Sequence, residues 1–177
     1  MVSLADLPDF EARHVLPSLS LGDSLRGLPH SRVLDVGSGA GLPGVPLAIA
    51  FPSSSFTLIE SRRKRANFLR HVVRTLELPN VTVVCNRVEQ WVPVERFEII
   101  VSRAVTDLAS LAEMTHHCRT PSGFLVVTAG PQTARRTEGM RSSVRVAEGH
   151  RARTTIIVAH PTCSPKATAT NVETVVD

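Results

Sequence analysis

The residues best suited to chemistry lie in one glycine-rich stretch near the start of the chain. Asp35 ends an apolar run and precedes three glycines at alternate positions: Gly37, Gly39 and Gly41. Glycines in such a turn permit positive φ angles and allow a ligand to approach the backbone closely. The apolar helical pattern that follows from Leu42 would offer unpaired N–H groups and a positive dipole end to the same ligand. The stretch predicts a turn that binds a nucleotide-like ligand, with the Asp35 carboxylate able to meet a cationic group.

Two kinds of cofactor bind to glycine turns of this type. The dinucleotide fingerprint spaces its glycines as G-x-G-x-x-G and holds a pyrophosphate. Here the spacing is G-x-G-x-G, and an acid stands on the strand just before it. A carboxylate at that place suits an α-ammonium better than a diphosphate, so the stretch resembles motif I of the class I S-adenosylmethionine (SAM) methyltransferases. A nicotinamide oxidoreductase is the alternative, which the spacing and the lack of a catalytic Tyr or His pair disfavour.

Alternating strand and helix patterns must position this turn. Segments rich in Val, Ile and Phe predict strands at 32–36, 56–60, 81–85, 97–102 and 123–128. Helical patterns lie between them, near 43–51, 62–77 and 107–119. This order predicts βαβ units and a parallel sheet. Two last strands, at 144–147 and 154–159, have no helix between them, so we expect an antiparallel pair. The predicted fold is α/β and Rossmann-like, with a mostly parallel sheet of about seven strands.

Length and composition favour one globular domain. The chain has 177 residues, of which 42% are hydrophobic and 20% charged. We expect a lead-in at 1–30, with a helical turn or two in Phe10–Leu16 before Pro17. A SAM-binding methyltransferase domain is predicted at 31–159. The segment 160–177 is rich in Thr, Ala and Pro, and we expect it to be disordered.

Several classes of protein are disfavoured by the sequence. No apolar run approaches the roughly 20 residues of a membrane helix, and no signal peptide opens the chain. Three cysteines without metal-ligand spacing, Cys85, Cys118 and Cys163, favour a reduced, cytoplasmic setting without a bound metal. The net charge of +4 suggests an anionic partner. We expect a monomer that does not associate with membranes.

Further candidate site residues follow the predicted strands, where ligands bind in such sheets. Glu60 closes the second strand and could accept hydrogen bonds from ribose hydroxyls. Val88 and Glu89 follow the third strand, where they could frame an adenine ring. Arg103 follows the fourth strand and could contact the carboxylate of the cofactor or an RNA phosphate. Each charged residue could instead be a solvated strand end or a partner in a surface salt bridge.

A basic run marks the helix predicted at 62–77. Its cations have no acid among them until Glu77, and they oppose the preference of a helix N-terminus for acids. Such an arrangement suggests contact with phosphates, although a charge run is more often a solvated face. The candidate RNA-binding residues are Arg62, Arg63, Lys64, Arg70 and Arg74.

A more specific resemblance emerges when the motifs are taken together. The stretch 13–16 (Arg-His-Val-Leu), the turn and its Leu-Pro-Gly-Val-Pro-Leu continuation at 42–47, and the segments 60–69, 87–89 and 101–104 occur in order. They resemble the family of small-subunit (16S) ribosomal RNA guanine-N7 methyltransferases, known also as glucose-inhibited division protein B. The resemblance implies SAM as cofactor and a guanine of small-subunit rRNA, free or in the ribosomal subunit, as substrate. It also implies cofactor contacts at Gly37, Leu42, Val88, Glu89 and Arg103.

The chain departs from the family pattern in three places. Family members carry a longer, largely helical segment ahead of the stretch 13–16, Pro17 replaces a usual Asp, and Ala129 replaces a Lys before Gly130. We therefore expect normal SAM binding but slower methylation of RNA than in a full-length relative. The alternatives are a SAM-dependent methyltransferase with another substrate and a truncated SAM-binding protein with little turnover.

Overall fold

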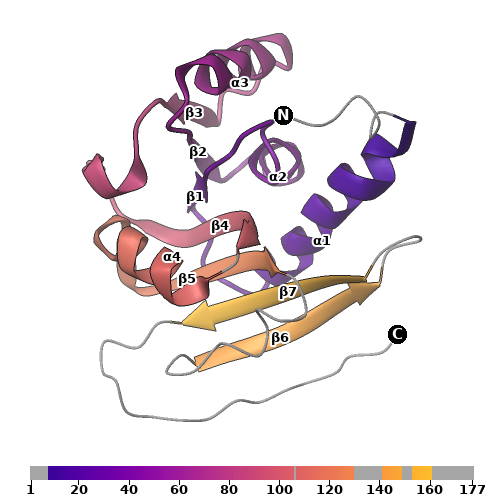
Figure 1. Ribbon diagram of the computed structural model, residues 1–177, viewed down its shortest axis with the longest axis vertical. Helices are drawn as coiled ribbons and strands as arrows, with labels where there is room; N and C mark the ends of the chain where they lie inside the picture. Colours follow the sequence, from indigo (N-terminus) through magenta and orange to yellow (C-terminus); the bar gives the residue numbers. More distant parts are fainter. Residues whose placement is uncertain (1–7, 106, 130–140, 149–152, 161–177) are drawn as a thin grey trace.

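The computed structural model describes residues 8–105, 107–129, 141–148 and 153–160. A seven-stranded sheet in the order β3-β2-β1-β4-β5-β7-β6 forms its centre (Figure 1). Strands β1 to β5 pair in parallel, whereas β7 pairs antiparallel with both β5 and β6. This arrangement confirms the predicted fold, including its antiparallel last pair. The strands are β1 (Arg32–Val36), β2 (Ser55–Ile59), β3 (Val81–Val84), β4 (Phe97–Val105), β5 (Arg119–Ala129), β6 (Arg141–Glu148) and β7 (Arg153–His160).

Helices cover both faces of the sheet. One face carries α1, α2 and α3, and the other carries α4 (Figure 1). Because successive side chains of a strand point to opposite faces, Val33 packs into the first layer and Leu34 into the second. The helical segments are η2 (Glu11–Val15), α1 (Leu16–Leu25), α2 (Gly44–Ala50), α3 (Arg63–Thr75), η3 (Val88–Gln90), α4 (Leu108–Thr115) and η4 (His116–Cys118).

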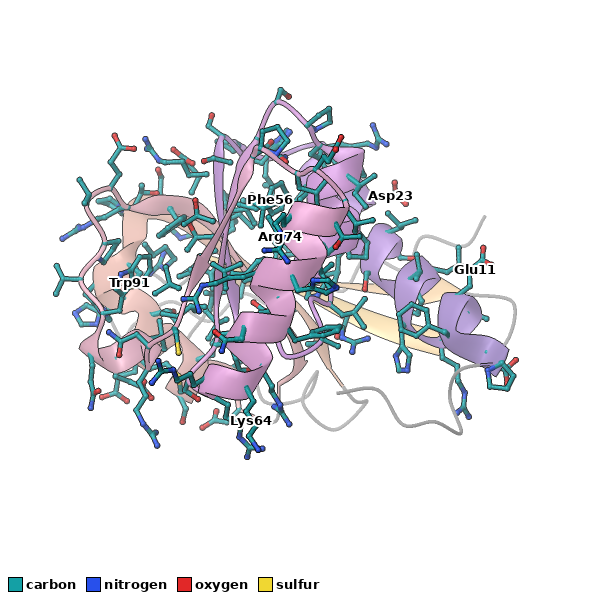
Figure 2. All side chains as sticks on the ribbon, turned by 90° about the horizontal axis from the view of Figure 1, so that it is seen from above. Glu11, Asp23, Phe56, Lys64, Arg74 and Trp91 are labelled. Atoms are coloured by element: carbon teal, nitrogen blue, oxygen red, sulfur yellow. The ribbon has the colours of Figure 1, made fainter. Side chains whose placement is uncertain are left out.

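The lead-in is more helical than the sequence suggests. The π-helical segment η2 continues directly into α1, and Pro17 lies in the first turn of α1 instead of ending the helix. The proline directly follows the π-helical turn, in which the amide of Leu16 donates to the carbonyl of Glu11. Glu11 and Asp23, labelled in Figure 2, lie toward the two ends of this continuous helical segment. Leu21 and Leu25 are fully buried in the core, so α1 is part of the packed structure.

Other expectations concern the ends and the surface. The tail expected to be disordered lies, from residue 161 on, outside the described residues. Among the residues that the structure describes, no helix is long and apolar enough to cross a membrane. The same part of the chain contains no group of His, Cys, Asp and Glu side chains that could hold a metal ion.

Candidate active site

The glycine turn joins β1 to α2 and is held against the neighbouring strand. The amide of Gly37 donates to the carbonyl of Ile59 at 2.9 Å, and the amide of Gly41 donates to the carbonyl of Ser38 at 2.7 Å. The φ angles of Gly37, Gly39 and Gly41 are +70°, +58° and +91°, in the region that favours glycine. A Cβ built at Gly37 would meet no heavy atom of the described residues within 4 Å. The outer part of the turn therefore has backbone that a ligand could approach.

Asp35 lies beneath this turn rather than at its surface. Its side chain is 0% exposed, and Oδ2 accepts a hydrogen bond from the amide of Gly44 at 3.1 Å. Within the described residues, Oδ1 has no hydrogen-bond partner. Burial raises the pKa of Asp35 to about 7, and the nearby Ser38 hydroxyl, the Gly44 amide and the charge of Arg103 only partly oppose this effect. In this conformation Asp35 braces the start of α2 through Oδ2, and its contact with a cationic ligand group stays a prediction.

Glu60 follows β2 directly and links three parts of the site. The residue is 4% exposed. Its carboxylate accepts hydrogen bonds from the amide of Gly39 at 3.1 Å and from the amide of Arg62 at 2.8 Å. Arg65 lies 3.9 Å from the same carboxylate. Glu60 therefore ties the glycine turn to the N-terminus of α3, where a negative charge offsets the clustered cations.

Arg103 lies near the end of β4, beside β1 in the sheet. It is half-buried, and burial lowers the pKa of its guanidinium while the charge of Asp35 opposes that effect. Its Nη1 donates to Nδ1 of His14 at 3.2 Å. Its Nε is buried and has no hydrogen-bond partner in the described parts of the chain. This donor suits a ligand that brings its own acceptor.

The remaining predicted contacts occupy the same edge. Leu42 is buried in the turn and Val88 is buried at the start of η3, whereas Glu89 is exposed. Because parallel strands end at one edge of a sheet, β1, β2, β3 and β4 bring the glycine turn, Glu60, the 88–89 pair and Arg103 to that edge. The structure thus gathers the candidate cofactor residues along four adjacent strand ends.

An apolar cavity of about 370 Å³ lies beside the turn, between the lead-in helix, α2 and α3. Of the candidate residues, Gly41 and Leu42 line it. The rest of its wall is apolar and includes Phe10, Phe68 and Val72. Such a wall lacks the charged groups that a zwitterionic ligand needs, so the polar candidates outside it define the site.

The basic residues of α3 divide into two groups. Arg63, Arg70 and Arg74 are spaced so that they share one face of the helix, and all three are exposed. Arg62 and Lys64 are exposed at the helix start, close to Glu60; Lys64 and Arg74 are labelled in Figure 2. The described residues place no acid within ion-pair distance of these five cations. The face is therefore available to an anionic partner.

Comparison with known proteins identifies the family. The sequence model of the family described as rRNA small subunit methyltransferase G (GidB) matches residues 1–161. The chain belongs to this family. The family match confirms the resemblance that rests on the glycine turn and its Leu-Pro-Gly continuation.

Relatives of this family are similar over most of the chain. A ribosomal RNA small subunit methyltransferase G from Haemophilus influenzae is 38% identical over 130 residues, which make up 73% of this chain and 63% of the relative. Its counterpart from Chromobacterium violaceum is 45% identical over 117 residues, or 66% of this chain and 55% of the relative. The chain thus spans less than two thirds of the length of these methyltransferase G relatives.

Solved structures support the fold of the family. A SAM-dependent O-methyltransferase from Thermotoga maritima superposes with a TM-score of 0.67 at 13% sequence identity, covering 92% of this chain and 72% of that protein. At such low identity the likeness concerns the fold alone. The class I methyltransferase fold predicted for this member of the methyltransferase G family is confirmed.

Sequence reasoning missed one side chain near the site. His14 belongs to the Arg-His stretch of the family resemblance, but spacing alone indicates no role for it. The structure places its ring against Arg103, 89 residues further along the chain. The only signal in the sequence is the position of His14 within that stretch.

Proposed function

We propose that the protein transfers a methyl group from SAM to N7 of a guanine in small-subunit (16S) ribosomal RNA. The observation that carries the proposal is the family match, combined with the gathering of the family's cofactor positions along four strand ends. We further propose that the protein works as a monomer in the cytoplasm on rRNA or on the ribosomal subunit.

The described residues fit a SAM molecule. The open backbone at Gly37 and Gly39 leaves room for a ligand, and the buried Nε of Arg103 provides a donor for a carboxylate. Glu60 is proposed to accept from ribose hydroxyls, since a carboxylate retains acceptor capacity beyond its bonds to Gly39 and Arg62. Leu42, Val88 and Glu89 would flank the adenine. Asp35 and Gly41 would shape the turn from below.

The chemistry requires positioning more than proton transfer. When bound, SAM supplies an electrophilic methyl group on a sulfonium. Guanine N7 carries a lone pair and no proton, so no general base is needed. The protein's contribution is then to orient the two reactants, which can supply several kcal/mol of a transfer barrier. Arg103 is the candidate orienting residue. It carries a positive charge at the end of β4, where it is half-buried and interacts electrostatically with Asp35.

Replacing Glu60 tests the cofactor site. Glu60→Ala should weaken SAM binding by about 1–3 kcal/mol, because it removes an acceptor for the ribose and for the Gly39 amide. Glu60→Gln keeps one acceptor oxygen and should weaken binding less. Calorimetric titration with SAM measures both variants. An affinity equal to that of the parent in Glu60→Ala would make Glu60 a bracing residue with no part in binding.

The basic face of α3 should contribute to the affinity for RNA and have no effect on the affinity for SAM. Replacing Arg63, Arg70 and Arg74 with glutamine should weaken binding of small-subunit RNA regardless of sequence. It should also flatten the salt dependence by about one unit of slope for each phosphate that the variant no longer binds. Affinity for SAM should stay unchanged. Arg70 and Arg74 lie roughly 10–16 Å along the helix from its first turn, and Arg63, in that turn, makes no ion pair with Glu60.

Filter binding at several salt concentrations gives the slope for this variant and for the parent. A slope equal to the parent's would contradict the assignment of the α3 face to RNA. A matching change of Arg26, Arg87 and Arg96, all exposed elsewhere, serves as the control.

Two measurements separate the alternatives to the proposal. Calorimetry with SAM and with NAD should give heat for SAM alone; binding of NAD without SAM would favour an oxidoreductase. Incubation with labelled SAM and small-subunit RNA should then transfer label to the RNA. Binding of SAM without methyl transfer would favour a SAM-binding protein with little turnover. Transfer to another acceptor would favour a SAM-dependent methyltransferase with another substrate.

A further inference from the structure

Arg103 is held by a residue from a distant part of the chain. Its Nη1 donates to Nδ1 of His14 at 3.2 Å. His14 lies on η2, whereas Arg103 lies on β4. The contact therefore joins the lead-in helix to the strand end that carries the candidate cofactor arginine.

Few other contacts restrain the guanidinium. In the described parts of the chain, its side chain hydrogen-bonds to His14, and Nε has no partner. Asp35 acts on it through charge. An arginine side chain has several rotatable bonds and five N–H donors, so one well-placed acceptor greatly limits the directions in which its other donors point.

His14 is itself well anchored. The ring of Phe10 lies 5.5 Å from its ring, centroid to centroid. The hydroxyl of Ser18 donates to the His14 carbonyl at 2.6 Å. The helix continues into α1, where Leu21 and Leu25 are buried in the core. An acceptor on this element has a fixed place relative to the sheet.

Nδ1 of His14 is the acceptor in this contact, because arginine can only donate. The remaining N–H donors, including the buried Nε, match a carboxylate, which arginine binds in a fork geometry.

We propose that His14 is a positioning residue that aims the Arg103 guanidinium at the carboxylate of the methionine part of the cofactor. This inference rests on the proposed function, because it takes SAM as the ligand. His14 acts through Arg103 and does not itself contact the reacting atoms.

The test compares two ligands in four variants. S-Adenosylhomocysteine carries the amino-acid end, whereas methylthioadenosine lacks it. His14→Phe keeps the ring beside Phe10 and removes the acceptor; it should weaken S-adenosylhomocysteine binding about tenfold and leave methylthioadenosine binding unchanged. His14→Asn places an amide oxygen near the former Nδ1 and should retain most of the affinity. Arg103→Met should weaken the same ligand at least as much, and adding His14→Phe to it should bring no further loss.

His30→Phe is the matched control. His30 is a half-buried histidine next to Phe51, with Nδ1 2.6 Å from the Leu28 carbonyl, and the same replacement there should leave both affinities unchanged. Equal loss for both ligands in His14→Phe, or a further loss on the Arg103→Met background, would overturn the inference. If Arg103→Met weakens S-adenosylhomocysteine but His14→Phe does not, this inference fails and the proposed function stands. If Arg103→Met has no effect, the assignment of Arg103 under the proposed function fails as well.

Discussion

Replacing Gly39 with valine is expected to abolish SAM binding while the sheet stays folded. The φ angle of Gly39 is +58°, where a β-branched residue is strained by roughly 1–2 kcal/mol. Among the described residues, the atom nearest to a Cβ at this position is the Gly37 carbonyl oxygen, at 3.7 Å, so the added side chain has room to extend into the space assigned to the ligand. Affinity should fall by at least about 100-fold, or ~2.7 kcal/mol. Calorimetry with SAM, and circular dichroism for the fold, measure the two effects.

Gly44 provides the contrasting variant. A Cβ at Gly44 would overlap the side chain of Leu58 and approach Oδ2 of Asp35 to 2.6 Å. Both neighbours are fully buried, so Gly44→Ala should lower the free energy of unfolding by about 1–3 kcal/mol or more. A Gly44→Ala protein as stable as the parent would contradict the assignment of Gly44 to the packed core. A Gly39→Val protein that binds SAM normally would contradict the assignment of Gly39 to the ligand site.

The second large effect concerns stability and pH. The pKa of Asp35 is raised from 3.8 to about 7 in the folded protein, first of all by burial. Between these values the folded state holds a proton that the unfolded state has lost, so stability falls as pH rises toward the folded pKa. This group alone should lower the free energy of unfolding by about 3 kcal/mol between pH 5 and pH 8. Urea unfolding at the two pH values measures the change.

Asp35→Asn is the control for that measurement. Asparagine keeps an acceptor for the Gly44 amide and cannot ionise, so the contribution of about 3 kcal/mol should disappear from the pH dependence. The comparison uses the difference between parent and variant because other carboxylates titrate in both. The same pH dependence in both proteins would show that Asp35 ionises in the folded state with an ordinary pKa.

The periodicity of the sequence is sufficient to predict the sheet. Strand β1 begins at Arg32 and ends at Val36, as predicted, because a short β-branched run flanked by polar residues and glycines leaves little choice of boundary. The antiparallel pair of β6 and β7 is also predictable, since no helix separates the two strands. The sequence predicts a helical turn or two in Phe10–Leu16, whereas the helical segment continues through Pro17 to Leu25.

The placement of the candidate residues at the strand ends is predictable from the sequence, but their burial and contacts are less so. The glycine turn and Glu60 follow from local order along the chain. The burial of Asp35 depends on how α2 packs over β1, and the contact between His14 and Arg103 joins residues 89 positions apart. Such long-range contacts arise from tertiary packing, and no periodic pattern in a single sequence predicts them.

The most direct measurement maps N7-methylguanine in small-subunit rRNA from three strains. One carries the parent protein, one lacks its gene, and one is complemented with Gly39→Val. We expect a methylated guanine in the first strain that is missing from the other two. Methylation that persists without the gene, or that Gly39→Val restores in full, would contradict the proposed function.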